Sequence, residues 1–246
     1  MRTILVVASL FASIMLAASP IKSNIGAKET GAICAEKMPY DAEVECLTTV
    51  EGFTTYINTG RPPELGDIYH IDFLFSAVNA NWLNIFGSYT KNTGVTSGTA
   101  TDCILLQEHG LNGNTNTLMR SWFGTNERRL HRINLNQRST FVMANNWAEL
   151  NGIRYTFTQT FAPLNTRYPI YIFTVNNAGN SVGVIKQTLS IYKYQVENNG
   201  KLVLDFIPVR FKNEVGKQEG AMFDKVSKKL FRNSGTGSFI IGPEKE

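Results

Sequence analysis

The residues best suited to acid–base chemistry form one short acidic run, Asp41-Ala-Glu-Val-Glu45. If this run is a strand, its three carboxylates lie on one face. Neighbouring carboxylates of this kind serve as nucleophile and general acid/base in glycan hydrolysis. However, the order differs from the Glu-x-Asp-x-Glu arrangement that such hydrolases carry on a strand, and the run precedes the stronger strand patterns. We therefore predict a solvated segment and no catalytic residue here.

Other residue types that support catalysis or metal binding are scattered. The three histidines, His70, His109 and His131, lack the spacing of zinc ligands with one another or with cysteine. No Gly-x-Ser-x-Gly nucleophile motif occurs, and Gly235-Thr-Gly-Ser238 is better explained as a turn into a strand. These observations predict no metal site and no cofactor.

Tryptophan beside asparagine or arginine is the stronger functional pattern. Sugar rings stack their C–H faces on aromatic side chains, while their hydroxyl groups need planar polar partners. Three stretches have this composition, and Trp147 is the best candidate because it follows two asparagines in a context typical of a loop. The alternative for each tryptophan is a packing role. The candidate ligand-binding residues are Trp147, Asn145, Asn146, Trp122, Arg120, Trp82 and Asn84.

Alternation of apolar and polar residues dominates the chain and predicts strands. In residues 69–76, Tyr69, Ile71, Phe73 and Phe75 would face the core. Asn-Gly pairs at residues 112–113, 151–152 and 199–200 predict hairpin turns, because both residues tolerate positive φ. Further strands are expected at residues 83–89, 103–107, 118–123, 129–135, 140–144, 153–157, 169–175, 189–196 and 202–211. So many short strands predict an all-β, two-sheet antiparallel β-sandwich.

Several motifs also resemble a known family. Residues 202–209, LVLDFIPV, are followed by GAMFDKVSKKLF at residues 220–231 and by NSGTGSF at residues 233–239. YINTG at residues 56–60, IFG at residues 85–87 and YPIYIFTVNNAG at residues 168–179 add to the pattern.

Together these motifs are similar to those of concanavalin A-like lectin/glucanase domains, in the laminin-G-like branch common in bacterial surface and prophage proteins. The resemblance implies a jelly-roll sandwich, carbohydrate recognition at the cell surface, and Ca²⁺ as the only metal to consider. We expect the last strand, near residues 238–241, to pair close to a first strand at residues 55–58.

The N-terminus predicts export. Met1-Arg2 precedes an apolar run over residues 3–18, which is typical of a secretory signal peptide and short for a membrane span. We assign residues 1–23 to the signal peptide, 24–46 to an irregular N-terminal arm and 47–246 to the sandwich domain. The predicted location is secreted or cell envelope (periplasm or cell surface), with no membrane span in the mature protein.

Three cysteines then lie in an oxidising compartment. Cys34 and Cys46 are nearest in sequence and are the candidate disulfide, although all three pairings stay open. Cys103 lies in an apolar, strand-like run, where a buried inert thiol is expected.

The amino-acid composition excludes one class of function. The chain has 43% apolar residues, 18% charged residues and a formal net charge of +4, which is too small to indicate nucleic-acid binding. We therefore predict a non-catalytic recognition module for a glycan or another cell-surface ligand. The alternatives are a glycan hydrolase or lyase on a jelly-roll scaffold, and a structural or adhesion module that binds protein.

Overall fold

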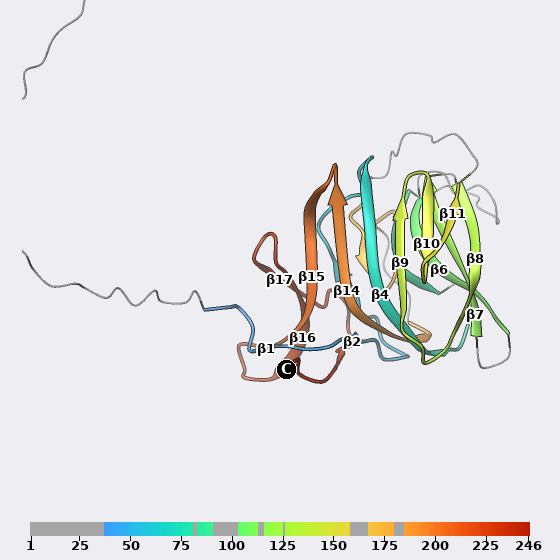
Figure 1. The fold of residues 1–246 in the computed structure, drawn as a ribbon. Helices are drawn as coiled ribbons and strands as arrows, with labels where there is room; N and C mark the ends of the chain where they lie inside the picture. Colours follow the sequence, from blue (N-terminus) through green and yellow to red (C-terminus); the bar gives the residue numbers. More distant parts are fainter. Residues whose placement is uncertain are drawn as a thin grey trace, which may run out of the picture. The chain divides into compact units, whose positions relative to one another are not determined.

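Two β-sheets pack face to face across one hydrophobic core (Figure 1). The computed structural model describes residues 37–80, 83–90, 103–112, 116–124, 126–157, 167–179 and 185–246. Within these residues the protein is an all-β sandwich, as the alternation predicts, and the strand pairs are antiparallel except for β13 with β5. The jelly-roll connectivity of concanavalin A-like domains is still an expectation that rests on the motif resemblance.

The larger sheet has eleven strands in the order β11-β10-β9-β4-β14-β15-β16-β17, with β1, β2 and β18 off this path. Its strands are β1 Ala42–Glu43, β2 Leu47–Thr48, β4 Asp67–Val78, β9 Ser139–Ala144, β10 Trp147–Leu150, β11 Ile153–Thr156, β14 Gln187–Asn198, β15 Lys201–Lys212, β16 Gln218–Asp224, β17 Lys229–Arg232 and β18 Ile240–Ile241.

The smaller sheet has seven strands in the order β3-β12-β5-β6-β7-β8, and β13 pairs with β5. Its strands are β3 Ile57–Asn58, β5 Asn84–Tyr89, β6 Cys103–Asn112, β7 Asn116–Gly124, β8 Asn126–Asn134, β12 Tyr171–Ile172 and β13 Asn176–Asn177.

The core is aromatic and joins the two sheets. Phe86 of β5 lies 5.7 Å from the Tyr69 ring and 5.5 Å from the Tyr194 ring, both of the larger sheet. Strand β4 buries alternate side chains as its sequence predicts. The core therefore depends on the period-2 pattern of each strand.

Two predicted turns are confirmed. Asn151 and Gly152 connect β10 to β11, and Asn199 and Gly200 connect β14 to β15, all four with positive φ. This is the geometry of two-residue hairpin loops. For the third pair, residue 113 lies outside the described residues.

Several sequence expectations need correction. Strand β18 pairs with β2 rather than with residues 55–58. A different part of the C-terminal segment runs beside those residues, since the amide of Ser234 donates to the carbonyl of Tyr56. The expected strand at residues 169–175 is only the short β12, followed by Phe173 with positive φ.

The sandwich also begins earlier than residue 47. Strand β1 pairs with β15, and the amide of Glu45 donates to the carbonyl of Pro243. Tyr40 packs on Phe223 with ring centroids 4.9 Å apart. The later part of the predicted N-terminal arm is therefore ordered against the sheet, because it covers apolar side chains on the outward face of β15 and β16. The predicted leader, residues 1–23, lies outside the described residues.

Candidate functional site

The outward face of the eleven-stranded sheet carries a line of side chains across six strands, all of them polar except Val142. The cross-strand register gives one line of core residues, which is Leu150, Phe141, Ile71, Tyr194 and Phe206, and the exposed Ile153 continues this line at the edge strand. The residues next to these along each strand must point to the outward face, because successive side chains of a strand alternate between the two faces of the sheet. They form a line that we call the polar row: Arg154, Glu149, Val142, His70, Gln195 and Asp205.

Side-chain contacts hold the polar row in place. Arg154 Nη2 lies 3.1 Å from Glu149 Oε2, and Gln195 Nε2 donates to Asp205 Oδ1 at 2.9 Å. Between them, His70 Nε2 lies 3.6 Å from an oxygen of Glu197, yet burial lowers the pKa of His70. The imidazole is therefore mainly neutral near pH 7 and can donate and accept hydrogen bonds.

Trp147 lies beside this row, at the start of β10. It is a strand residue, which corrects the expected loop, and the two preceding asparagines, Asn145 and Asn146, form the β9–β10 turn. The indole is partly buried, and the Arg154 guanidinium lies 3.9 Å from the ring centroid. The bond between Arg154 and Glu149 keeps that guanidinium over the ring. The result is an aromatic surface with a fixed polar border.

A second stacked arginine lies further along the same face. Arg138 Nε donates to Asp72 Oδ1 at 2.6 Å, and its guanidinium lies 4.1 Å from the Tyr192 ring. Asp72 is directly opposite Lys193 on β14. Asp72 therefore has two cationic neighbours, Arg138 and Lys193.

The remaining sequence-predicted residues lie on the opposite outward face, that of the seven-stranded sheet. Asn84 accepts a hydrogen bond from Gln107 Nε2 at 2.8 Å, and Gln107 is cross-strand to Arg120. Arg120 pairs with Glu127 at 3.1 Å and its guanidinium lies 5.8 Å from the Trp122 ring. Arg120 is only 6% exposed, which leaves little of it for a ligand.

The structure thus divides the candidates. It brings Asn145, Asn146 and Trp147 together at one hairpin, whereas Asn84, Arg120 and Trp122 form a separate group on the other side of the sandwich. Trp82 lies outside the described residues. The two groups cannot form one site, because the sheets and the core separate them.

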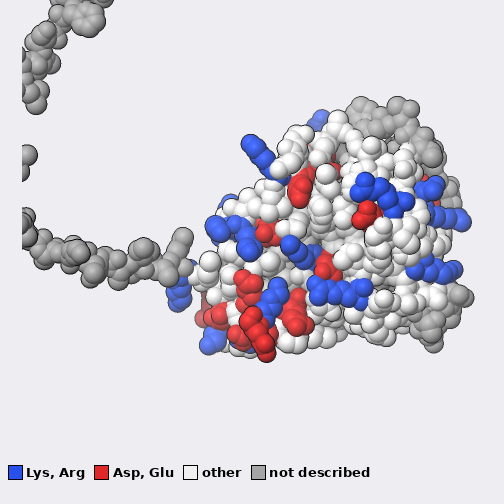
Figure 2. All heavy atoms as spheres, in the orientation of Figure 1, with Lys and Arg blue, Asp and Glu red and all other residues white. Residues whose placement is uncertain are grey.

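The acidic run has the alternation of a strand, with Asp41 and Glu45 exposed between buried neighbours. Figure 2 shows acidic atoms gathered at the lower left, where Figure 1 places β1 and the C-terminus. Glu43 accepts a hydrogen bond from Tyr40 at 3.4 Å. Among the described residues, no group of three His, Cys, Asp or Glu side chains could hold a metal ion.

The two described cysteines, Cys46 and Cys103, are buried and form no disulfide with each other. Burial raises the pKa of Cys103. Cys34 lies outside the described residues, so its pairing stays a prediction. A buried thiol with a raised pKa is a poor nucleophile.

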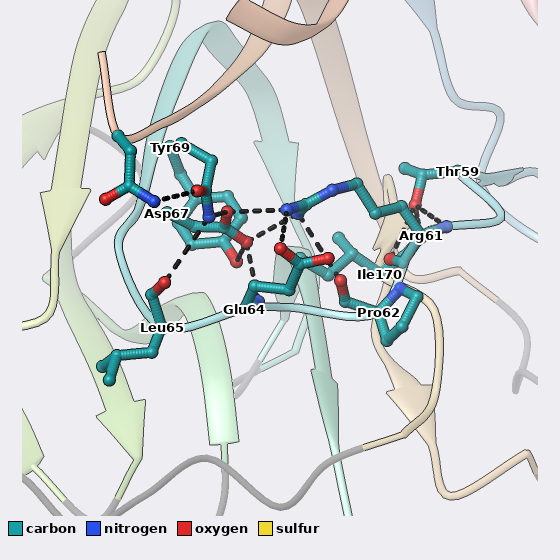
Figure 3. Close-up of polar contacts among 10 residues, drawn as sticks. Thr59, Arg61, Pro62, Glu64, Leu65, Asp67, Tyr69 and Ile170 are labelled. Carbon is teal, nitrogen blue, oxygen red and sulfur yellow. Dashed lines mark hydrogen bonds and ion pairs between the residues drawn. The ribbon is translucent and has the colours of Figure 1, made fainter. Parts of the chain in front are cut away.

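One buried polar cluster was not expected from the sequence. Asp67, which is 0% exposed, binds both terminal nitrogens of Arg61 at 2.6 and 2.8 Å (Figure 3). The same carboxylate accepts bonds at 2.8 Å from the Tyr69 hydroxyl, the Glu64 amide and the Asn198 side chain. All of its acceptor positions are used internally, so the cluster anchors the loop before β4 instead of binding a ligand.

A sequence signal for this cluster does exist. Asp67 has the same alternation phase as Tyr69 and Ile71, which places its carboxylate toward the core. A buried carboxylate requires a cationic partner, and Arg61 is the nearest arginine in the sequence. The alternation of side chains along β4 therefore marks Asp67 as a buried carboxylate, although no motif includes it.

No family model matches this sequence, and no curated protein is similar to it. Among the described residues, no helix is long and apolar enough to cross a bilayer. The chemistry of the two outward faces is therefore the basis for proposing a function.

Proposed function

We propose that this protein is a non-catalytic recognition module that binds glycan at Trp147 and the polar row. The observation that carries the proposal is the partly buried indole of Trp147, held by the Arg154 guanidinium 3.9 Å away, beside a line of hydrogen-bonded planar side chains. The predicted leader and the family resemblance support a role outside the cytoplasm.

The physical match is with sugar rings. Aromatic faces pack against C–H groups, while carboxylates, amides and guanidinium groups bond to hydroxyls. Because Arg154, Gln195 and Asp205 are already held by their neighbours, they lose little side-chain entropy when a ligand binds. Arg154 occupies one face of the indole, so a sugar either contacts the open part of the ring or displaces the guanidinium.

The test uses the exported full chain on immobilised polysaccharides. Trp147→Ala should weaken glycan binding by roughly 1–3 kcal/mol, the usual size of an aromatic stacking contact. Trp122→Ala is the matched control, because it removes the same residue type from the opposite outward face. Equal losses in both variants, or no glycan retention by the unchanged protein, would overturn the proposal.

Catalysis by the same sandwich is the main competing function. Three carboxylates of the binding face have a side-chain partner, Glu149 with Arg154, Asp72 with Arg138 and Asp205 with Gln195, which favours recognition over hydrolysis. Incubation with mixed polysaccharides should therefore release no new reducing ends or unsaturated products. Turnover that is abolished by Glu43→Gln with Glu45→Gln would identify a hydrolase or lyase. Capture of a protein partner without glycan retention would identify an adhesion module.

A further inference from the structure

Strand β8 is the last strand of the seven-stranded sheet among the described residues and is strongly basic. Arg128, Arg129 and Arg132 are all exposed. Among the described carboxylates, none lies within ion-pairing distance of these three arginines. Figure 2 shows basic atoms along the side of the molecule where Figure 1 places β8.

This edge continues to the glycan-binding face through Tyr155 of β11. The Arg128 guanidinium lies 5.8 Å from the Tyr155 ring, and the Tyr155 hydroxyl lies 2.9 Å from His131 Nδ1. The residue before Tyr155, Arg154, stacks on Trp147. We use the name basic edge for Arg128, Arg129, Arg132 and Arg154.

A further positive charge, that of Arg120, lies beside the basic edge. Arg129 lies directly opposite Arg120 on β7, and Glu127 is the carboxylate that pairs with Arg120. Burial, followed by the charges of Arg120 and Arg129, lowers the pKa of His109 nearby. A positive potential of this kind favours an anionic partner. The register shifts between Arg129 and Arg132, so that three residues of β8 match two of β7. The two arginines are therefore about 7 Å apart along the sheet, a spacing that suits neighbouring anionic groups on an extended chain.

We propose that the ligand is an acidic polysaccharide that passes around the edge between the two sheets. Its carboxylate or sulfate groups bind the basic edge on the β8 side, while its rings contact Trp147 and the polar row on the β11 side. This inference rests on the proposed glycan-binding function and adds the ligand's charge class. Guanidinium groups bind such oxyanions through two parallel hydrogen bonds. The adjoining indole and hydroxyl-binding side chains favour a sugar chain over a nucleic acid.

The experiment compares two forms of one polymer, polygalacturonate and its carboxyl-reduced derivative, using the exported full chain at 50 and 300 mM salt. Arg129→Gln with Arg132→Gln should weaken polygalacturonate binding on the order of tenfold at low salt, because two charged contacts are lost. Binding of the reduced polymer should not change. Arg129→Lys with Arg132→Lys keeps the charge and should retain more binding than the glutamine variant.

Lys225→Gln with Lys229→Gln is the matched control, since it removes the same charge from exposed positions at β16–β17. An equal loss in this control would overturn the inference, as would equal wild-type affinity for the charged and reduced polymers. Duplex DNA bound as tightly as polygalacturonate would overturn it in favour of a nucleic acid. If wild type binds only the reduced polymer, the glycan function stands and the acidic class fails. If it binds neither, both fail.

Discussion

Asp67 gives the sharpest test of what holds the loop before β4 in the sandwich. Asp67→Asn removes a charge from a site that is 0% exposed and turns an amide NH₂ toward donors that now face a carboxylate. Removing one partner of a buried ion pair costs about 3–5 kcal/mol. The Arg61 side chain is 17% exposed, so water relieves part of the loss and the expected cost is about 3 kcal/mol.

Urea unfolding followed by tryptophan fluorescence measures this cost, and a thermal scan should show a midpoint lowered by roughly 6–12 °C. Asp205→Asn is the matched control, because Asp205 lies on the outward face, with one side-chain hydrogen bond, from Gln195. The control should cost less than about 1 kcal/mol. A cycle with Arg61→Gln should show coupling between Arg61 and Asp67 of about 1–3 kcal/mol.

The prediction fails if Asp67→Asn and Asp205→Asn destabilise the protein equally, because the buried network would then contribute no more than an ordinary surface hydrogen bond. If Asp67→Asn is the more destabilising but its coupling with Arg61 is close to zero, the ion pair is not the cause, and the cost lies in the bonds from Tyr69 and Asn198.

Two further predictions concern pH and backbone packing. Burial is the main cause that lowers the pKa of three side chains, His70, His109 and His131. The unfolded chain therefore binds more protons below about pH 6.5, so the free energy of unfolding should fall as pH falls through this range. Urea midpoints at pH 7.5 and 5.5 check the sign, and a flat profile contradicts it. Separately, Gly235→Ala should destabilise the fold by about 1–3 kcal/mol, because a Cβ there would lie 1.6 Å from the carbonyl oxygen of Thr54. Gly110→Ala, with open space at its Cβ, should unfold near the wild-type midpoint, and a similar loss in both would contradict the packing argument.

Local patterns in the sequence determined the strands and their turns. The buried phase of β4 follows directly from alternation, and the hairpin loops at Asn151–Gly152 and Asn199–Gly200 follow from the tolerance of these residues for positive φ. These properties depend on neighbours within a few residues, which is why the sequence alone predicted them. The same alternation, extended back to Asp67, marks a buried carboxylate that no motif indicated.

Only the tertiary structure decided which strands meet. Trp147 and Trp122 occur in similar polar surroundings along the chain, yet one lies on β10 of the larger sheet and the other on β7 of the smaller sheet. The union of Arg128, Tyr155 and Arg154 at one edge likewise joins strands from both sheets. The partner of β18 was mistaken for the same reason. Side-chain alternation is set within one strand, whereas strand order is set by contacts between segments far apart in sequence, and those contacts become visible only when both sheets are packed.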